Sequence, residues 1–406
     1  MLLDDRIELL DDVRATLARI LAGDSLMAHK LRQSGIDNPA DVASLADVQR
    51  LPFTTRAELV ADQAAHPPYG TNLEAPLESY VRVSTTRGVS GPPLRWLHTN
   101  ESLTWRSRRW QIALMSVGVT AADRVLFAVD LPACWDALHA LGALSIVAPR
   151  RHLHRAQATL QHQVTVVMCT PTDALRLTEA AADGHIDLAN APVRRVVVWG
   201  EAAGHLSSTR RRIEQCFGAP VADVYVLREV GIVGWNCHVG ARALHLDQVE
   251  MLVESVDGEL VLTPLGPSGM PLVRYRTGDL IEVLQQSCQC GRPARLVLVK
   301  GRLDERLHVR GIDLLPADIE NVVRRHPAVR EYQIEAFDVR GERELAVDIE
   351  PDPAIASEGD RARVAAEVAE DLKRSLGLRL QCEAVPPETL TRGESRPRRV
   401  VHRHLR

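Results

Sequence analysis

The sequence predicts a two-domain α/β protein, with a large layered α/β domain followed by a smaller α+β domain. Its 406 residues are too many for one typical hydrophobic core, so at least two domains are expected. Short β-rich runs alternate with helical stretches over residues 80–235, which is typical of a parallel sheet covered by helices. A Gly-containing junction at residue 301 then precedes a final segment with its own helix and strand patterns.

The N-terminal residues predict helices, because apolar side chains recur at helical spacing over residues 7–21. The run LPFTT ends this pattern, and Thr54 or Thr55 is expected to cap a helix that begins at Arg56. Apolar runs predict buried strands at 125–129, 164–168 and 196–199, with helices at 172–182 and 207–216 between them.

The remaining chain predicts further strands at 259–262 and 296–299. In the final segment we expect a helix at 316–325, a hairpin within 339–349 and a helix at 362–376.

The bulk composition excludes several functional classes. A formal net charge of −4 gives no electrostatic case for binding nucleic acid or an anionic membrane. No apolar run reaches the roughly 20 residues that a membrane helix needs, and the acidic N-terminus is unlike a signal peptide. The count of seven cysteines is odd, so a disulfide framework is not expected. We therefore expect a cytoplasmic protein without nucleic-acid or membrane partners.

Four motifs occur in order along the chain: LPFTTR at 51–56, GEA at 200–202, YRTGD at 275–279 and GRLD at 301–304. This ordered set resembles the phenylacetate–CoA ligase family, within the superfamily of acyl-CoA synthetases, peptide-synthetase adenylation domains and luciferases. The resemblance covers almost the whole chain. It implies an AMP-binding domain over residues 1–301 and a small mobile domain over 302–406. The family reaction joins a carboxylate to ATP as an acyl-adenylate and then transfers the acyl group to a thiol.

The YRTGD motif has the clearest physical interpretation. Asp279 follows a turn glycine at the end of a predicted strand, where its carboxylate can accept hydrogen bonds from both ribose hydroxyls. The resemblance assigns Asp279 this role, and the alternative is a turn with a capping aspartate. The resemblance also implies that Tyr225 stacks on adenine, and that the backbone around the same base is supplied by Gly200, Glu201 and Ala202.

The resemblance implies roles in phosphate binding and domain movement for three charged residues. Glu229 would hold the Mg²⁺ that bridges the ATP phosphates, because a carboxylate is a hard oxygen ligand for a hard cation. Arg302 would reach the ribose or phosphate, and Asp304 would be the pivot about which the small domain rotates. The alternative for Arg302 and Asp304 is a solvated charged turn. In the motif of Glu229, Val226 replaces the family's glycine and Arg228 replaces its serine or threonine.

The phosphate-binding loop is the weakest match to the family. The aligned run TRGVSGPP keeps Gly88, Gly91 and the hydroxyl of Ser90, which would let amides and a hydroxyl approach phosphate. Val89 removes a second hydroxyl, and Pro92 stands in place of a lysine. The alternative is an ordinary loop.

The C-terminal segment carries the sharpest departure from the family. Arg396 stands where the family has a lysine that contacts the carboxylate and α-phosphate during adenylation. Arginine is also cationic and binds phosphate, but its planar fork is not equivalent to a point-charge ammonium. Either Arg396 replaces the lysine with altered efficiency, or the first step is impaired.

A separate group of residues has the composition of a metal site. Cys288 and Cys290 resemble a knuckle found in part of the family, and Cys237 with His245 fits its upstream half. These ligands would satisfy tetrahedral Zn²⁺ with no open position, so the ion would be structural. His238 is a competing ligand. The alternative is a pair of ordinary surface thiols, since Cys-x-Cys is tighter than the usual Cys-x-x-Cys spacing.

The resemblance therefore predicts an ATP- and Mg²⁺-dependent ligase of a specialised biosynthetic pathway, with catalytic roles for Arg396, Glu229 and Arg302. Its substrate would be an aromatic or other small carboxylic acid, with Trp135 and Phe127 lining the acyl pocket. The acyl acceptor would be CoA or another nucleophile. Two alternatives remain open: a repurposed relative with altered or lost adenylation, and a non-enzymatic interaction protein. A homodimer is also left open.

Overall fold

The computed structural model describes residues 8–86, 92–128, 131–201, 204–237, 239, 243–339, 341–390 and 399–403. The chain divides into two compact units, each built from several segments. Unit 1 consists of Met1–Asp123, Asp130–Ser145 and Ala222–Leu298, and unit 2 consists of Arg124–Val129, Ile146–Val221 and Val299–Arg406. The predicted mixed α/β architecture is confirmed. Within the described ranges, no helix combines the length and the apolar composition that crossing a bilayer requires.

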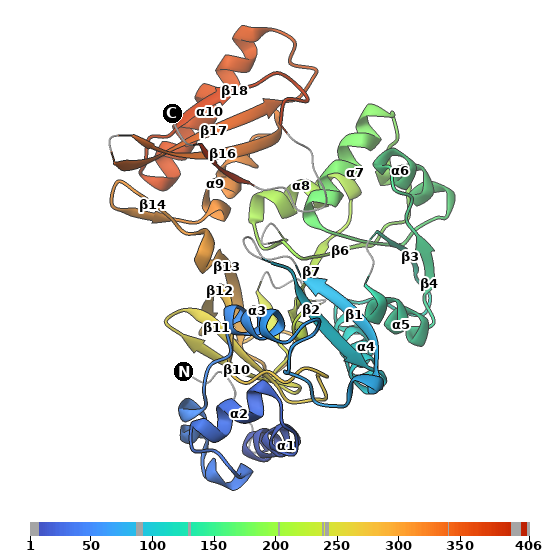
Figure 1. Ribbon diagram of the computed structural model, residues 1–406. Helices are drawn as coiled ribbons and strands as arrows, with labels where there is room; N and C mark the ends of the chain where they lie inside the picture. Colours follow the sequence, from blue (N-terminus) through green and yellow to red (C-terminus); the bar gives the residue numbers. More distant parts are fainter. Residues whose placement is uncertain are drawn as a thin grey trace. The chain divides into compact units, whose positions relative to one another are not determined.

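Unit 1 joins helices to a largely antiparallel sheet (Figure 1). Its helices are α1 (Leu9–Leu21), α2 (Leu26–Gln33), α3 (Arg56–Ala65), α4 (Asn100–Ser116) and α5 (Pro132–Leu141). Its sheet strands are β7 (Val221–Leu227), β8 (Gly231–Trp235), β9 (Leu244–Leu246), β10 (Met251–Val256), β11 (Glu259–Pro264), β12 (Tyr275–Leu284) and the first half of β13 (Leu296–Arg302). They lie in the order β10-β11-β12-β13-β9-β8-β7, while β1 (Tyr80–Thr86) and β2 (Leu94–Thr99) form a separate antiparallel pair.

The N-terminal helices form where the sequence predicts them. In α1 the residues Leu9, Val13 and Leu17 recur at helical spacing and are fully buried against α2 and the sheet core. Thr55 caps α3: its side chain accepts from the Glu58 amide, and the Glu58 carboxylate accepts from the Thr55 amide at 2.7 Å. This reciprocal capping box explains why the helix starts at Arg56.

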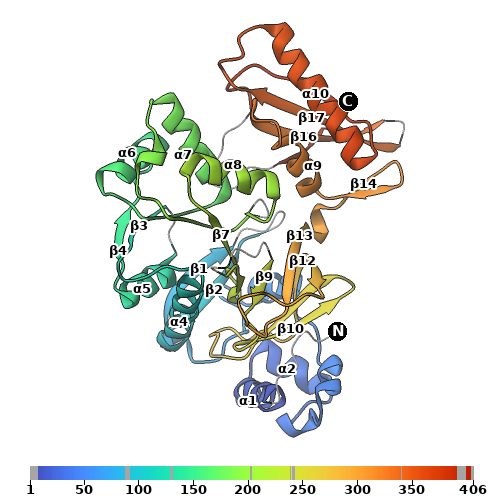
Figure 2. The same cartoon turned by 180° about the vertical axis from the view of Figure 1, so that it is seen from behind.

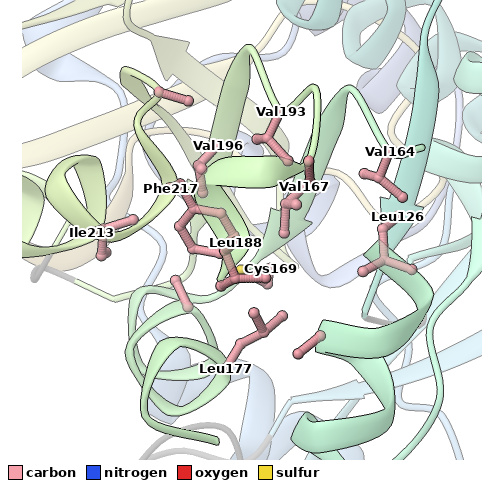
Figure 3. Packing of buried hydrophobic residues seen from close by; sticks show 14 of the residues in the cluster. Leu126, Val164, Val167, Cys169, Leu177, Leu188, Val193, Val196, Ile213 and Phe217 are labelled. Carbon is pink, nitrogen blue, oxygen red and sulfur yellow. The ribbon is translucent and has the colours of Figure 1, made fainter. Parts of the chain in front are cut away.

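Unit 2 contains the parallel strands that the sequence predicts. These are β3 (Arg124–Phe127), β5 (Val166–Cys169) and β6 (Arg195–Trp199), with β4 (Leu144–Val147) beside β3 in the order β6-β5-β3-β4. Both β3–β5 and β5–β6 pair in parallel. Helices α6 (His152–Gln161), α7 (Pro171–Asp183) and α8 (Ser207–Phe217) cover one face, and Figure 3 shows Leu126, Val167, Leu177 and Phe217 meeting in the core between the layers.

The C-terminal part of unit 2 has its own sheet and core (Figure 2). Strands β16 (Val329–Val339) and β17 (Glu342–Pro351) pair antiparallel, flanked by β19 (Val400–Arg403) and β18 (Gln381–Ala384). The segment also contains β14 (Leu307–Val309), β15 (Ile312–Leu314), α9 (Pro316–Val323) and α10 (Glu358–Leu376). The predicted hairpin within 339–349 is wrong in its bounds, because this segment supplies only the second strand. Alternation along β17 reflects one buried face, and that pattern looks the same for one long strand as for two short ones.

Candidate active site and metal centre

Two motifs that lie far apart in the sequence are joined in unit 1. Thr54 forms a parallel bridge with Tyr275, and its hydroxyl donates to the Val273 carbonyl at 2.6 Å. The Arg274 guanidinium stacks on the Phe53 ring at 4.1 Å and pairs with the buried Glu254 carboxylate at 2.9 Å. The LPFTTR run is therefore a structural support for the start of β12, the strand that carries Asp279.

Asp279 lies within β12 and not at the end of a strand as predicted, and a buried carboxylate holds the backbone before it where the β11–β12 register shifts. Glu259 accepts from the Gly278 amide at 2.9 Å and from the Arg276 guanidinium, while Thr277 accepts from the Asp279 amide at 3.0 Å. Gly278 has φ of 75°, a left-handed conformation that glycine adopts without a Cβ penalty. These bonds fix the backbone on which the Asp279 carboxylate is mounted.

Tyr225 and Asp279 come together from β7 and β12. The Tyr225 hydroxyl donates to Asp279 Oδ2, and Asp279 is 6% exposed while Tyr225 is half-buried. A carboxylate has about four lone-pair sites, so this bond leaves capacity for further donors. The nucleotide roles of the two residues stay predictions, and their direct contact is a structural fact that supports them.

Glu229 lies in the turn that follows β7, and two buried arginines of α4 hold that turn. Arg106 donates to the carbonyls of Arg228 and Glu229 at 3.0 and 2.6 Å. Arg109 donates to the Val230 carbonyl at 2.9 Å. The Glu229 side chain is half-buried, and its assignment as a magnesium ligand remains a prediction.

Arg56 lies beside the predicted phosphate loop. Its guanidinium donates to Thr86 Oγ1 at 3.1 Å and to the Pro92 carbonyl at 3.1 Å, so it bridges the two residues that flank 87–91. The predicted phosphate-binding residues themselves lie outside the described part of the chain; these are Gly88, Ser90 and Gly91.

Glu201 belongs to unit 2, where it follows Gly200 at the end of β6. The Thr172 hydroxyl donates to Glu201 Oε2 at 2.6 Å, and Gly200 has a left-handed φ of 87°. Burial, with the nearby Glu320 carboxylate, raises the pKa of Glu201 to about 7, although the Thr172 hydrogen bond acts in the opposite direction. Ala202 lies outside the described residues.

The predicted hinge carries an exposed ion pair. Arg302 Nε donates to Asp304 Oδ1 at 2.8 Å, and the two side chains are 35% and 51% exposed. Gly301 has φ of 147°, and a Cβ there would lie 3.3 Å from Leu315 Cδ1. A glycine is therefore favoured at this junction, which is compatible with a hinge and with a charged turn alike.

Arg396 lies outside the described residues, but the residues on either side of that segment are well anchored. The Leu390 amide donates to Glu350 Oε2 at 3.3 Å. Arg399 donates to Glu331, which also accepts from Arg324 at 3.0 Å. The two guanidinium groups stack on the buried Tyr332 ring.

The four predicted metal ligands meet in unit 1. The ligand atoms of Cys237, His245, Cys288 and Cys290 all lie within 4.8 Å of one another. The Cys237–Cys288 Sγ separation and the Cys290 Sγ–His245 Nε2 separation are each 3.5 Å. Tetrahedral bonds of about 2.3 Å to sulfur and about 2.0 Å to nitrogen place such ligands about 3.5–3.8 Å apart, so the spacing fits Zn²⁺. Burial and the Arg292 charge lower the pKa of His245, which favours the neutral imidazole that binds metal. The competing ligand His238 lies outside the described residues.

Sequence reasoning missed the supporting arginines. Nothing in the LPFTTR run indicates that Arg56 bridges the flanks of the loop, because its acceptors are two backbone carbonyls and one threonine hydroxyl about 30 residues away or more. For Arg106 and Arg109 there was a signal: the run WRSRRW lies in a helix and places arginines on its apolar, tryptophan-bearing face. Arginine on a buried helix face needs partners, so such a pattern points to acceptors on a neighbouring element.

Comparison with known proteins shows what the whole chain is similar to. A family model described as the AMP-binding enzyme C-terminal domain matches residues 311–404. A phenylacetate–coenzyme A ligase of Aromatoleum evansii is 26% identical over 396 residues, which cover 90% of this chain and 87% of that protein. The phenylacetate–coenzyme A ligase of Thermus thermophilus is 25% identical over 410 residues, covering 91% and 90% of the two chains.

Solved structures share the fold. A 2-hydroxyisobutyryl-CoA ligase, crystallised in its postadenylation state with an acyl-adenylate, matches with a TM-score of 0.90 at 21% identity. That match covers 97% of this chain and 89% of the other. An anthranilate CoA ligase in complex with anthranoyl-AMP matches with a TM-score of 0.59 at 17% identity, covering 84% and 71% of the chains. The chain is an enzyme homologous to the phenylacetate–coenzyme A ligases, and it shares its fold with the solved acyl-CoA ligases.

Proposed function

We propose that this protein activates a small carboxylic acid with ATP as an acyl-adenylate and then transfers the acyl group to coenzyme A. The observation that carries the proposal is the buried Asp279 carboxylate, mounted on a supported segment of β12 and in contact with Tyr225. This pair offers an aromatic face for a base and acceptors for ribose hydroxyls, on a chain whose curated relatives are CoA ligases.

In the first step a carboxylate oxygen of the acid attacks the α-phosphorus of ATP. A bond forms between that oxygen and phosphorus, the bond to the β-phosphate oxygen breaks, and pyrophosphate leaves. Glu229 would hold Mg²⁺, which offsets charge on the phosphates, and Arg396 would neutralise the reacting carboxylate and α-phosphate. In the second step the CoA thiol loses its proton, its sulfur attacks the acyl carbon and AMP leaves.

The substrate class is the finer part of the proposal. An aromatic acid is the first candidate, because relatives include ligases named for phenylacetate and anthranilate. A branched hydroxy acid is also represented among the structural matches. We further propose that the reaction belongs to a biosynthetic pathway. We place the protein in the reducing cytoplasm, in keeping with the odd number of cysteines.

The Cys237–His245–Cys288–Cys290 cluster is proposed to bind one structural Zn²⁺. Cys237 follows β8 and His245 lies in β9, whereas both other cysteines belong to the β12–β13 connection. The ion would therefore tie that connection to β8 and β9. Four protein ligands leave no open coordination position, so the ion would stabilise the fold and take no part in the reaction.

A repurposed relative is the second candidate. Its support is that Val89, Pro92, Arg228 and Arg396 all depart from the family on the phosphate side, while Tyr225 and Asp279 on the ribose side are retained. Such a protein would bind nucleotide and make acyl-adenylate slowly or not at all.

Pyrophosphate release over a panel of aryl and alkyl acids separates the two candidates. Acid-dependent release, with an acyl-CoA product identified by mass spectrometry, supports the ligase. Loss of that release in Arg396→Ala would show that arginine performs the role of the lysine and would reject the repurposed candidate. Binding of ATP by calorimetry without release for any acid would reject the ligase proposal.

A further inference from the structure

Two arginines on one face of α4 bury their guanidinium groups beneath the turn that carries Glu229. Arg106 and Arg109 are 8% and 1% exposed, and residues three apart lie on the same face of a helix. The Trp105 ring covers Arg109 at 4.5 Å. Neither arginine takes part in the nucleotide contacts that the family resemblance implies.

The backbone carbonyls that these two arginines bond lie within residues 228–232, which comprise the β7–β8 turn and the first two residues of β8. Arg106 bonds the carbonyls of residues 228 and 229 at 3.0 and 2.6 Å. Arg109 bonds the carbonyl of Val230 at 2.9 Å and that of Ile232. Gly231, the first residue of β8, has φ of +82°, and a Cβ at this position would lie 3.6 Å from both arginines. The turn therefore rests directly on the two side chains.

The two arginines differ in how their charges are compensated. Arg109 Nε donates to the buried Asp247 carboxylate at 2.8 Å, which forms an ion pair. Within the described residues Arg106 donates to neutral carbonyls, and the charge that acts on it favourably is that of Glu229. Burial and the neighbouring Arg109 lower the pKa of Arg106 to about 10, so its guanidinium stays protonated at neutral pH.

Burying an arginine without a hydrogen-bonded carboxylate costs free energy. A turn at the end of a strand does not need a buried arginine to form. Water or a neutral side chain could satisfy the same carbonyls. The arrangement instead places a rigid, five-donor group where it fixes the backbone of residues 228–232 and its charge reaches the Glu229 carboxylate.

We propose that Arg106 and Arg109 are positioning residues, which hold the 228–232 turn so that Glu229 is oriented for the metal-bound phosphates of ATP. This inference rests on the proposed ligase function. It adds that Arg106, through its contact with the Glu229 backbone, sets how tightly the magnesium-bound nucleotide is bound.

The test compares Arg106→Lys with Arg108→Lys, which changes an exposed arginine of the same helix. Lysine keeps the charge but cannot bond two carbonyls in a fixed fork. We expect Arg106→Lys to lower kcat/KM for ATP about tenfold or more and to raise the Mg²⁺ concentration needed for half-maximal rate. Amide exchange measured by mass spectrometry should quicken within 228–232. Arg108→Lys should match the wild type in all three measurements.

Wild-type kcat/KM and Mg²⁺ dependence in Arg106→Lys would overturn the positioning role, even if thermal stability falls. Unchanged amide exchange at 228–232 would overturn the inference that the two arginines hold this segment. If Arg106→Lys does not fold, Arg109→Lys gives the same comparison, because it bonds the same turn. A wild-type protein without acid-dependent pyrophosphate release would reject the proposed function. The inference would then be judged by calorimetric binding of Mg-ATP, which should still weaken in Arg106→Lys but not in Arg108→Lys.

Discussion

The hydroxyl of Tyr225 donates a hydrogen bond to the carboxylate of Asp279, joining strands whose residues are 54 positions apart. The contact orients the carboxylate and holds the edge of the tyrosine ring. Both residues were selected from separate motifs, and their meeting supports a single nucleotide site. It also makes their roles separable by substitution, because ring, hydroxyl and carboxylate can be removed one at a time.

Asp279→Asn should lower kcat/KM for ATP about 10-fold to 100-fold, since a hydrogen bond to a charged acceptor contributes about 1.5–3 kcal/mol. Tyr225→Phe keeps the ring and should cost about tenfold or less, whereas Tyr225→Ala should cost more. The measurement is acid-dependent pyrophosphate release as ATP is varied. A wild-type KM for ATP in Asp279→Asn would reject the ribose role.

Arg56→Ala should raise KM for ATP about fivefold to tenfold with a smaller effect on kcat. The substitution removes bonds that tie Thr86 to Pro92 across the predicted phosphate loop, and each lost bond costs about 1 kcal/mol. Arg50→Ala is the matched control, because Arg50 is exposed and its ion pair, with Asp47 at 3.2 Å, is local. Equal kinetics in the two variants would show that Arg56 does not support nucleotide binding.

Cys288→Ser should reduce bound zinc from about one equivalent to well below it and lower the melting temperature, because structural zinc sites contribute folding free energy. Elemental analysis of the purified protein and thermal unfolding with and without a chelator give the two measurements. Cys216→Ser provides the control, since Cys216 is an exposed thiol outside the cluster. Wild-type protein without zinc, or with zinc retained after Cys288→Ser, would contradict this assignment.

Glu201→Gln should stabilise the protein at alkaline pH relative to acidic pH. The folded-state pKa of Glu201 is raised from 4.5 to about 7, so the folded state binds a proton more tightly than the unfolded chain. Stability from this group is therefore full at low pH and declines as pH rises between these values. Glutamine stays neutral, so the melting temperature of the variant minus that of the wild type should be larger at pH 8 than at pH 5.

The exposed Glu367→Gln variant is the control for that comparison. Its melting-temperature difference from wild type should not change between the two pH values. If the Glu201→Gln difference is likewise constant, the carboxyl does not titrate in this range.

The sequence by itself determined the elements whose cause is local. The capping box at Thr55, the apolar period of α1 and the buried runs of β3, β5 and β6 depend on neighbours within a few residues, so the pattern alone predicts them. The hairpin around residue 340 was misplaced because alternation along one strand does not mark where a turn begins. The ordered motifs also indicated the family resemblance, and that resemblance singled out Asp279, Tyr225 and the cysteine cluster.

Only the tertiary structure decided which of these residues meet and what supports them. The Arg106–Glu229 contact spans 123 positions, and Thr54 reaches Val273 across 219. Such contacts are set by strand order and helix packing, and the acceptors are backbone carbonyls that every residue possesses. A sequence can therefore show that a buried arginine needs partners, but the fold selects them, because hydrogen-bonding geometry at long range depends on the position of the whole strand.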